Sequence, residues 1–451
     1  MELRPYQKAG VQYLMRHPRA LLADEPGLGK TGQALCALDA QQSYPALVVC
    51  PASVKTHWAH QSYDWLGRKA NIIETGKDVL DDSAAITIVS YDLLRSVEKR
   101  ASYCTLILDE LFKCKTENTQ RTRHALALAK RARYVWGLSG TPIINRPLEL
   151  VSQLDVLGQL HLFGDKWKFI YRYCNPVPRE IWVPRWNPAQ RRAVPVRQKF
   201  LDCTGQSNIA ELHQKLAQSL MLRRRKVEVA QELPERLSLP LLIDLDEAGR
   251  KLYGDARKDL MQWLQANSGR VTMQRAEALM KLTKMRQAAG LAKLSRLIPA
   301  IEDLLESGDK VVLFAYSRGL QQALLRHFGV EAAHVLGDDD ARTRTTQIEE
   351  FVRNPKLRVC VCSLMATAIG TDGLQHAARY LVFCDLGDEA AIHQQAIDRL
   401  HRMGQSRDVT AYYAVASGTI EEEMMNRLVF KNTITSVVAD GRVVRALLEA
   451  A

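Results

Sequence analysis

The sequence contains no apolar run that approaches the roughly 20 residues of a membrane-spanning helix, and Met1–Pro5 carries no apolar signal core. It also contains no C-x-x-C pair, no internal repeat and no low-complexity segment. The nine cysteines are an odd number and several lie within apolar runs, which indicates reduced, buried thiols instead of a disulfide framework or zinc site. We therefore expect a soluble protein without a membrane partner, in the cytoplasm of a prokaryote or its virus or in a eukaryotic nucleus.

What the chain does have is a globular composition and an excess of positive charge. Its 451 residues are 47% hydrophobic and 25% charged, which is enough apolar material for two or three cores. Lys and Arg number 62 against 50 acidic residues, giving a net charge of +12. Such a field attracts polyanions, so nucleic acid is the first partner to consider, although charge alone does not separate this class from an unrelated basic protein.

Short apolar runs alternate with helical stretches in two parts of the chain, which is typical of parallel α/β sheets. The first series of expected strands comprises Ala20–Ala23, Ala46–Cys50, Ile86–Ser90, Thr105–Leu108 and Tyr134–Leu138. The second comprises Lys310–Ala315, Arg358–Ser363, Tyr380–Asp385 and Val409–Ala414. Each series has the length of one nucleotide-binding lobe, so we expect an α/β protein with two such lobes.

The chain changes character between the two series. Residues 176–200 carry five prolines and two tryptophans, which predicts an irregular piece with room for a β-hairpin. A basic run follows at Leu220–Lys226, and residues 246–306 have the apolar spacing of helices. The expected domains are a first lobe (1–160), a basic irregular insertion and connector (161–236), a helical insertion (237–306) and a second lobe (307–451).

The segment Asp24–Thr31 follows an apolar strand and precedes a helical pattern, which is the context of a phosphate-binding loop. Gly27 and Gly29 have no side chains to keep backbone N–H groups from phosphate oxygens. Lys30 can reach the β- and γ-phosphates, and Thr31 can place its hydroxyl on Mg²⁺. The alternative is a glycine turn with a chance lysine, but the strand–loop–helix context favours nucleotide binding.

An acidic pair, Asp109 and Glu110, ends an apolar strand. Parallel sheets bind ligands at the carboxyl ends of their strands, and a nucleotide hydrolase needs a carboxylate for Mg²⁺ and a group that orients water. We assign these roles to Asp109 and Glu110 respectively. Such a pair can also cap a helix, but the phosphate loop about 80 residues upstream favours the catalytic interpretation.

Further segments accompany these two motifs in a fixed order. They are Leu3–Gln7, Cys50–Val54 with Trp58, Leu138–Pro142 with Asn145 and Leu148–Leu150, Met221–Arg225 with Leu233 and Pro234, Val311–Tyr316, Gly370–Gln375 and Gln394–Gln405. The whole set resembles the motifs of the SWI/SNF-type ATPases of helicase superfamily 2. The resemblance implies two tandem RecA-like lobes of the P-loop NTPase type, with a helical and irregular insertion between them.

The resemblance also assigns roles to individual residues. ATP would be bound by Gln7, which reads adenine, and by Gly27, Leu28, Gly29, Lys30, Thr31 and Gln395. Mg²⁺ would be held by Thr31 and Asp109, and catalysis would depend on Lys30, Asp109, Glu110, Arg399 and Arg402. Arg402 would be the arginine finger and Arg399 its companion, because a guanidinium stays charged and forks onto the γ-phosphate. The spacing of Gln395, Arg399, Arg402 and Gln405 predicts one face of a helix.

The same resemblance implies an ATP-driven motor that translocates on double-stranded or forked DNA through mostly sequence-independent backbone contacts. The expected DNA-binding residues are Lys55, Ser139, Thr141, Arg191 and Arg192, with Arg185 and Arg223–Arg225 as further candidates. For the arginines, a solvated surface is an equally good interpretation. Arg286–Lys293 and Arg172–Cys174 are similar to the annealing-helicase, HARP-related branch. Because the chain begins at the adenine-reading segment, we expect a monomeric motor without that branch's accessory DNA-binding domain.

Three departures from the usual patterns stand out. Asp24 occupies the position of the first glycine in the general form G-x-x-x-x-G-K-[ST], and the Gly370–Gln375 segment is irregular. Leu111 and Phe112 replace the usual alanine or serine followed by histidine. Neither can make the hydrogen bond by which that histidine links the ATP site to the Leu138–Pro142 motif. We therefore expect hydrolysis to survive but its coupling to DNA to differ.

Two other functions compete with duplex translocation. The first is a strand-separating DNA or RNA helicase, against which the SWI/SNF resemblance argues because such motors usually move without unwinding. The second is a non-catalytic binding module in which the change at Leu111 and Phe112 marks an inactive ATPase. The presence of Lys30, Glu110 and Arg402 argues against this second alternative.

Overall fold

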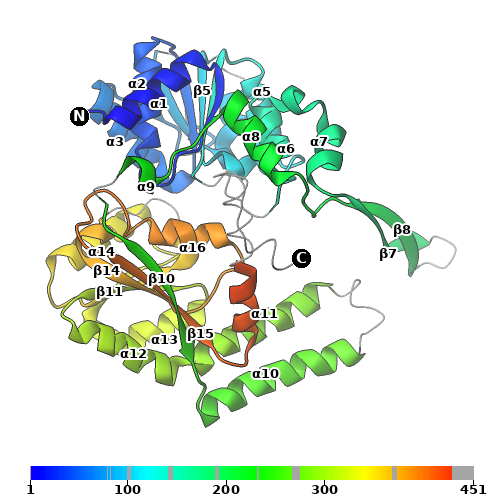
Figure 1. Cartoon of the computed structure of the whole chain (residues 1–451), viewed down its shortest axis with the longest axis vertical. Helices are drawn as coiled ribbons and strands as arrows, with labels where there is room; N and C mark the ends of the chain where they lie inside the picture. Colours follow the sequence, from blue (N-terminus) through cyan, green and yellow to red (C-terminus); the bar gives the residue numbers. More distant parts are fainter. Residues whose placement is uncertain are drawn as a thin grey trace. The chain divides into compact units, whose positions relative to one another are not determined.

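The computed structural model describes residues 2–78, 80–81, 83–98, 103–140, 146–187, 192–230, 233–266, 275–367 and 373–428. The described part of the chain forms two compact units. The first runs to Asn175 and includes Thr204–Leu233, and the second comprises Pro176–Cys203 and continues from Pro234. Each unit contains one parallel sheet, and we call the units lobe 1 and lobe 2 (Figure 1).

The sheet of lobe 1 contains the five strands expected there, each within one residue of its expected bounds. Its strands are β1 (Arg19–Leu22), β2 (Ala46–Cys50), β3 (Asn71–Ile72), β4 (Ile86–Ser90), β5 (Thr105–Asp109), β6 (Tyr134–Leu138) and β9 (Met221–Leu222). They lie in the order β3-β4-β2-β5-β6-β1-β9, and all neighbours are parallel. Strands β2 and β4 are buried along their whole length, because helices cover both faces of such a sheet.

Helices of lobe 1 fill the connections between its strands. They are α1 (Pro5–Arg16), α2 (Lys30–Ala40), α3 (Lys55–Leu66), α4 (Leu94–Glu98), α5 (Gln120–Ala129), α6 (Glu149–Val156), α7 (Lys166–Tyr173), α8 (Ile209–Ser219) and α9 (Lys226–Val229). Helix α1 has proline at its first position, where the missing N–H costs nothing. Leu14, Leu35 and Trp58 bring α1, α2 and α3 onto one face of the sheet in a single buried core.

The sheet of lobe 2 is also parallel throughout. Its strands are β10 (Arg236–Ile243), β11 (Lys310–Ala315), β12 (Ala332–Val335), β13 (Val359–Ser363), β14 (Ala378–Phe383) and β15 (Val409–Ala416), in the order β10-β15-β14-β11-β13-β12. Its helices are α10 (Glu247–Ala266), α11 (Arg275–Ala292), α12 (Leu294–Glu306), α13 (Arg318–Phe328), α14 (Ala341–Arg353), α15 (Leu364–Thr367) and α16 (Ala390–Ile397). The four strands expected here are confirmed to within two residues, and α10–α12 confirm the expected helical stretch.

The proline-rich segment is more regular than expected. Strands β7 (Val177–Asn187) and β8 (Arg192–Asp202) form an antiparallel ribbon that stays in register from Val177↔Asp202 to Asn187↔Arg192. Proline is compatible with this ribbon because each strand has only one partner, so an outward-facing N–H is not needed for pairing. The ribbon therefore agrees with the β-hairpin for which the sequence left room, and its backbone is more regular than the prolines predicted.

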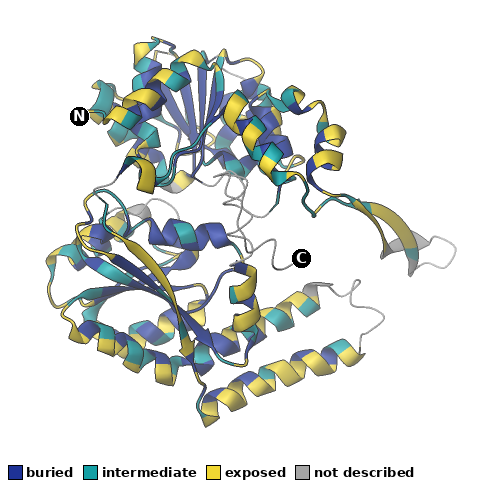
Figure 2. Cartoon of the chain, viewed as in Figure 1, coloured by how far each residue is buried: buried dark blue, intermediate teal, exposed yellow. Residues whose placement is uncertain are grey.

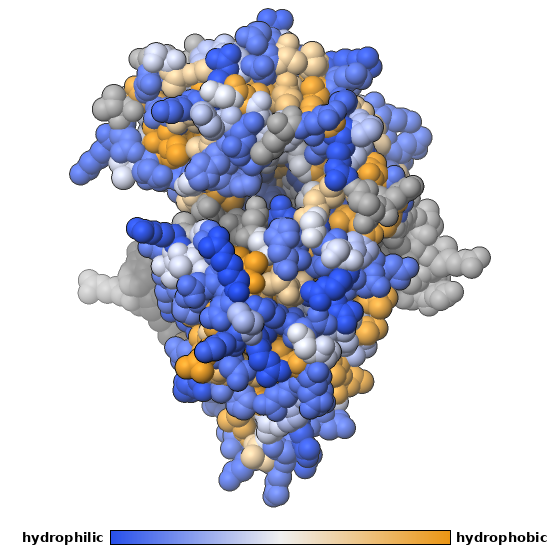
Figure 3. Space-filling view, turned by 90° about the vertical axis from the view of Figure 1, so that its left-hand side faces the viewer, coloured by the Kyte–Doolittle hydropathy of each residue, from blue (hydrophilic) through white to orange (hydrophobic). Residues whose placement is uncertain are grey.

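Burial follows the layers of both lobes. The central strands are buried, whereas the described residues at the base of the β7–β8 ribbon and much of β10 are exposed (Figure 2). On the face drawn in Figure 3, hydrophilic side chains predominate and apolar ones form small separate groups. All nine cysteines are free thiols and six are buried, as expected. Among the described residues, no helix is long and apolar enough to cross a membrane.

Candidate active site

The phosphate loop connects β1 to α2 and depends on two glycines. Gly27 and Gly29 have φ angles of +87° and +73°, in the left-handed region that favours glycine. A Cβ at Gly29 would lie only 2.3 Å from Nε2 of Gln7. The backbone conformation therefore favours glycine at position 29, and a side chain there would also displace the amide of the expected adenine-reading residue.

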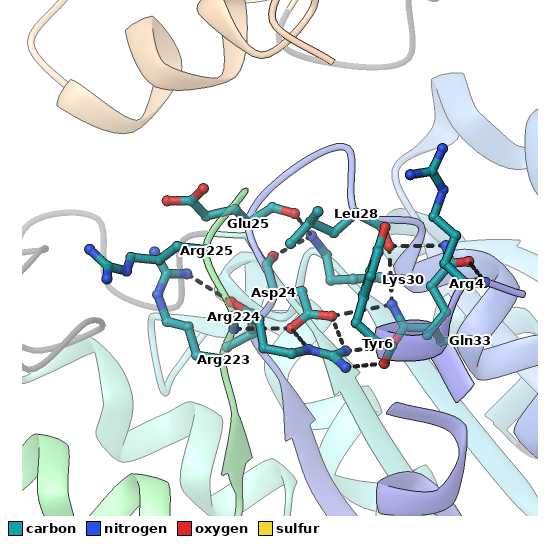
Figure 4. A network of polar contacts seen from close by, with 12 residues as sticks. Arg4, Tyr6, Asp24, Glu25, Leu28, Lys30, Gln33, Arg223, Arg224 and Arg225 are labelled. Atoms are coloured by element: carbon teal, nitrogen blue, oxygen red, sulfur yellow. Dashed lines mark hydrogen bonds and ion pairs between the residues drawn. The ribbon is translucent and has the colours of Figure 1, made fainter. Parts of the chain in front are cut away.

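Lys30, the first residue of α2, folds back onto its own loop. Its Nζ donates to the carbonyl oxygens of Asp24 at 2.7 Å and Glu25 at 3.4 Å (Figure 4). Burial lowers the pKa of the Lys30 ammonium, and nearby carboxylates, of which Glu110 has the largest effect, oppose this change. The ammonium therefore lies at the expected phosphate site and within electrostatic reach of the acidic pair. Thr31 follows in the first turn of the same helix.

The acidic pair lies at the carboxyl end of β5, as expected. Asp109 accepts a hydrogen bond from Nε1 of Trp58 at 2.8 Å and another from the Glu110 backbone N–H at 3.1 Å. The Tyr91 hydroxyl donates to the Asp109 carbonyl oxygen at 2.8 Å. Burial raises the pKa of Asp109, whereas the Trp58 hydrogen bond and the charge of Lys30 lower it. Glu110 has a φ of 53°, so the chain turns sharply directly after the strand.

Gln7 connects α1 with the phosphate loop. Its Oε1 accepts from the Arg4 backbone N–H at 2.9 Å, and its Nε2 donates to the Leu28 carbonyl oxygen at 3.2 Å. The side chain is only 9% exposed. The structure therefore brings the expected adenine-reading residue against the loop that the sequence assigns to phosphate.

The expected DNA-binding residues are placed very differently from one another. Lys55 is buried at the start of α3, where its Nζ donates to the Ile73 carbonyl oxygen at 2.9 Å and pairs with Glu74. Ser139 is buried directly after β6. Thr141 and Arg191 lie outside the described residues, as do three of the six residues of the Gly370–Gln375 motif, and Arg192 is described only as the first residue of β8. Contact with DNA remains a prediction for all of these residues.

Two of the further DNA candidates point into lobe 1. Arg223 donates from Nη1 to the carbonyl oxygens of Ala23 at 2.7 Å and Gly140 at 2.9 Å. Arg224 forms a buried ion pair with Asp24, the residue that replaces the first glycine of the phosphate loop (Figure 4). The basic run therefore supplies structural contacts beside the nucleotide site, which the charge pattern alone did not reveal.

The arginine motif of lobe 2 is not the single helical face that its spacing predicted. Helix α16 ends at Ile397, and Arg399 and Arg402 lie in the turns that follow. Hydrogen bonds from Arg399 N to Ala396 O and from Leu400 N to Ile397 O tighten the chain into i→i+3 turns. Gln395 and Gln405 are buried, and Gln405 Nε2 donates to the Ala378 carbonyl oxygen at 3.0 Å. Both arginine side chains are half-buried.

Sequence reasoning missed two contacts of the site. It assigned Trp58 to a DNA-contacting motif, although the indole also donates to the proposed Mg²⁺ carboxylate. It noted Asp24 only as a departure, whereas the Asp24 carboxylate is the anchor for Arg224. The position of Asp24 directly after an apolar strand was the signal available in the sequence, because a carboxylate next to a buried strand is expected to be buried itself and then requires a partner.

These elements define a class of protein. A parallel sheet in which one strand enters a glycine-lined loop, and another ends in an acidic pair, is typical of P-loop nucleotide hydrolases. Residues 6–291 match the SNF2-related domain family, and residues 292–404 match the helicase conserved C-terminal domain. The chain therefore belongs to the SNF2-related family. This confirms the predicted resemblance to SWI/SNF-type ATPases, the two RecA-like lobes and the helicase-like ATPase class.

The similar proteins include members of the branch suggested by the sequence. The human DNA annealing helicase and endonuclease ZRANB3 is 29% identical over 462 residues, covering 98% of this chain and 41% of that protein. The Xenopus tropicalis SWI/SNF-related matrix-associated actin-dependent regulator of chromatin subfamily A-like protein 1 is 32% identical over 440 residues. The match covers 93% of this chain and 43% of that protein. The chain thus spans about two fifths of these relatives. The Sulfolobus solfataricus SWI2/SNF2 ATPase core in complex with dsDNA has a TM-score of 0.44 and 22% identity, with 98% of this chain and 94% of that chain covered.

Proposed function

We propose that this chain hydrolyses ATP at the carboxyl edge of the lobe 1 sheet and uses the energy to translocate on double-stranded DNA. One observation carries the proposal. The phosphate loop after β1 and the acidic pair after β5 lie at the same edge of one sheet, and the Lys30 ammonium interacts electrostatically with both Asp109 and Glu110. The match to the SNF2-related family supports the same function.

The oxygen donors at this edge fit a nucleotide carrying Mg²⁺. Thr31 supplies a hydroxyl at the start of α2 and Asp109 supplies a carboxylate, and Mg²⁺ prefers hard oxygen ligands of this kind. When held by Thr31 and Asp109, Mg²⁺ would supply positive charge that offsets the negative charge of the phosphates. The site also contains a cation of its own, because the Lys30 ammonium interacts electrostatically with both carboxylates.

Each side chain then has a chemical role. Lys30 would exchange the Asp24 and Glu25 carbonyl oxygens for phosphate oxygens, and Glu110 would orient the attacking water. Gln7 would read adenine, for which its amide offers both a donor and an acceptor. We place Gln395 among the nucleotide-binding residues on the family pattern alone.

Lobe 2 would contribute the arginines. We propose that Arg402 stabilises the charge that spreads over the γ-phosphate in the transition state, with Arg399 as its companion. A guanidinium suits this task because it stays charged and binds two oxygens at once. Arginine fingers contribute large factors to hydrolysis, about 10³- to 10⁵-fold where they have been removed or supplied.

DNA is the polyanion that we propose for the excess of positive charge. The net charge of +12 favours backbone contacts that do not depend on base sequence. We retain Lys55, Ser139, Thr141, Arg191 and Arg192 as the contact candidates. We further propose that the motor acts as a monomer on duplex or forked DNA.

The test is steady-state ATP hydrolysis with Mg²⁺, with and without duplex DNA, for the wild-type chain and for Lys30→Ala and Arg402→Ala. We expect DNA to stimulate the wild type and both substitutions to abolish this stimulated activity. Lys69→Ala is the matched control, because Lys69 is an exposed lysine of lobe 1. Translocation is then measured at several salt concentrations by the displacement of a third strand from duplex DNA. Unwinding of a forked duplex would instead support the alternative function, a strand-separating helicase. Hydrolysis that Arg402→Ala leaves undiminished would remove the arginine finger from the proposal.

A further inference from the structure

A two-residue strand attaches the basic run to the phosphate loop. Strand β9 pairs with β1, and the hydrogen bonds between the two segments continue beyond the strands. The Ala23 N–H donates to the Leu222 carbonyl oxygen at 2.7 Å, and the Glu25 N–H donates to the Arg224 carbonyl oxygen at 3.0 Å. The backbone of the run is therefore fixed directly alongside the first half of the phosphate loop.

The Arg224 side chain then joins three segments of lobe 1 (Figure 4). Its Nε donates to Asp24 Oδ1 at 2.9 Å and its Nη2 to Gln33 Oε1 at 2.7 Å, with a second contact from Nη2 to Asp24 Oδ2. Its Nη1 donates to the Tyr6 carbonyl oxygen in α1, and the guanidinium carbon lies 5.4 Å from the centre of the Tyr6 ring. One guanidinium therefore contacts the adenine-reading helix, the phosphate loop and helix α2.

The neighbouring residues are shaped around this side chain. A Cβ at Gly10 of α1 would lie 1.8 Å from Gln33 Oε1 and 2.8 Å from Arg224 Nη2, so only glycine leaves room for the contact. Gln33 Nε2 donates to the Leu28 carbonyl oxygen at 3.1 Å, the same oxygen that accepts from Gln7. The contacts thus run continuously from Arg224 to the residue that is expected to read adenine.

Burial makes this arrangement rigid. Asp24 is fully buried and the Arg224 side chain is only 13% exposed. A buried carboxylate is costly unless a partner and further hydrogen bonds compensate its charge, so neither residue can leave the pair cheaply. The forked guanidinium satisfies several acceptors in one plane, which the point charge of lysine cannot do.

We propose that Arg224 is a positioning residue that holds the adenine-reading segment and the phosphate loop at a fixed spacing, and so sets the preference of the site for ATP over other nucleoside triphosphates. This inference rests on the proposed function, in which Gln7 reads adenine. It also assigns Arg224 to nucleotide recognition, whereas the charge pattern had made it a DNA candidate.

The experiment compares KM and kcat for ATP and for GTP at saturating duplex DNA in the wild type, Arg224→Gln and Arg224→Lys. We expect both substitutions to raise KM for ATP about tenfold with little change in kcat, because they remove binding that is equal in the ground and transition states. KM for GTP should change little, so the preference for ATP falls. Arg68→Gln is the matched control, because Arg68 pairs with Asp39 at the surface of the same lobe.

A double variant separates positioning from simple stability. Arg224→Gln alone leaves the Asp24 carboxylate buried without its cation, whereas Asp24→Asn with Arg224→Gln removes both charges. We expect the double variant to regain the melting temperature but not the preference for ATP. Recovery of both properties in the double variant would overturn the inference. An Arg224→Gln variant that keeps the wild-type ratio of kcat/KM for ATP to kcat/KM for GTP would overturn it as well. So would an Arg224→Gln variant that loses affinity for DNA while its KM for ATP stays unchanged. Absence of hydrolysis in the wild type, or hydrolysis that survives Lys30→Ala, would instead overturn the proposed function.

Discussion

The hydrogen bond between Trp58 and Asp109 offers a direct test of how lobe 1 prepares its proposed Mg²⁺ ligand. Trp58 is 1% exposed and its Nε1 lies 2.8 Å from Asp109 Oδ2. Trp58→Phe keeps an aromatic ring in the core but removes the N–H donor. A hydrogen bond to a charged group contributes about 1.5–3 kcal/mol, which corresponds to about one to two powers of ten in an equilibrium constant. We therefore expect the Mg²⁺ concentration for half-maximal hydrolysis to rise about tenfold or more.

The pH dependence should change in a defined direction. Burial already raises the pKa of Asp109 above its ordinary value, and the Trp58 hydrogen bond opposes that rise because it favours the ionised form. Without the bond the pKa rises further. Asp109 must be ionised to bind Mg²⁺, so activity is lost as the pH falls through this pKa. The acid limb of kcat/KM should therefore move to higher pH in Trp58→Phe.

The assay is DNA-stimulated ATP hydrolysis over a range of pH values and Mg²⁺ concentrations. Trp65→Phe is a matched control, because Trp65 lies in the same helix and donates its Nε1 proton to Gln61 at 3.0 Å, away from the acidic pair. Thermal unfolding of both variants monitors the loss of packing. If Trp58→Phe has the same acid limb and Mg²⁺ requirement as Trp65→Phe, the indole does not prepare Asp109 and the reasoning fails.

Two further predictions concern stability and the phosphate loop. Lys293 is fully buried and donates to Glu421 and to the Ala414 carbonyl oxygen, both at 2.6 Å. Lys293→Met should cost about 3–5 kcal/mol in urea unfolding because it strands a buried carboxylate, and adding Glu421→Leu should recover much of that loss. A double variant as unstable as the single one would contradict this. Gly29→Ala should impose about 1–2 kcal/mol of left-handed backbone strain and push against Gln7, so ATP affinity measured by calorimetry should fall. Unchanged affinity would show that the loop rearranges on binding.

The sequence predicted the central strands well because buried parallel strands are continuous apolar runs. Strand β2 is such a run, and its observed bounds are the expected ones. Strand β9 has two residues and β12 has the sequence Ala-Ala-His-Val, so neither carries a strong strand pattern. Strand β10 lies at the edge of its sheet and exposes both faces, which removes the contrast between buried and solvated positions. These misses therefore follow from length and position in the sheet.

The candidate site was predictable where its residues are close in sequence. The glycines, Lys30 and Thr31 lie in one loop, and Asp109 and Glu110 are adjacent, so local chemistry was sufficient. The Arg224–Asp24 pair joins residues 200 positions apart, and a basic run gives no indication of which acid it faces. The arginine motif of lobe 2 failed in a different way, because i→i+3 turns end the helix without a proline or glycine before Arg399. Spacing alone does not reveal such an ending.

The departure at Leu111 and Phe112 has a structural explanation that bears on coupling. Leu111 is fully buried directly after the acidic pair, and a Cβ at Gly137 of β6 would lie 2.5 Å from its Cδ2. The larger side chain at position 111 and the glycine at position 137 are therefore complementary. Strand β6 leads directly to Ser139 and Gly140, so movement of the Glu110 turn would be transmitted to that motif by packing. Because close-packed interiors deform little, the Leu111 side chain cannot move without moving the β6 backbone that it contacts. We infer that steric contact takes the place of the hydrogen bond that a histidine would make there, so the proposed hydrolysis would act on that motif through packing.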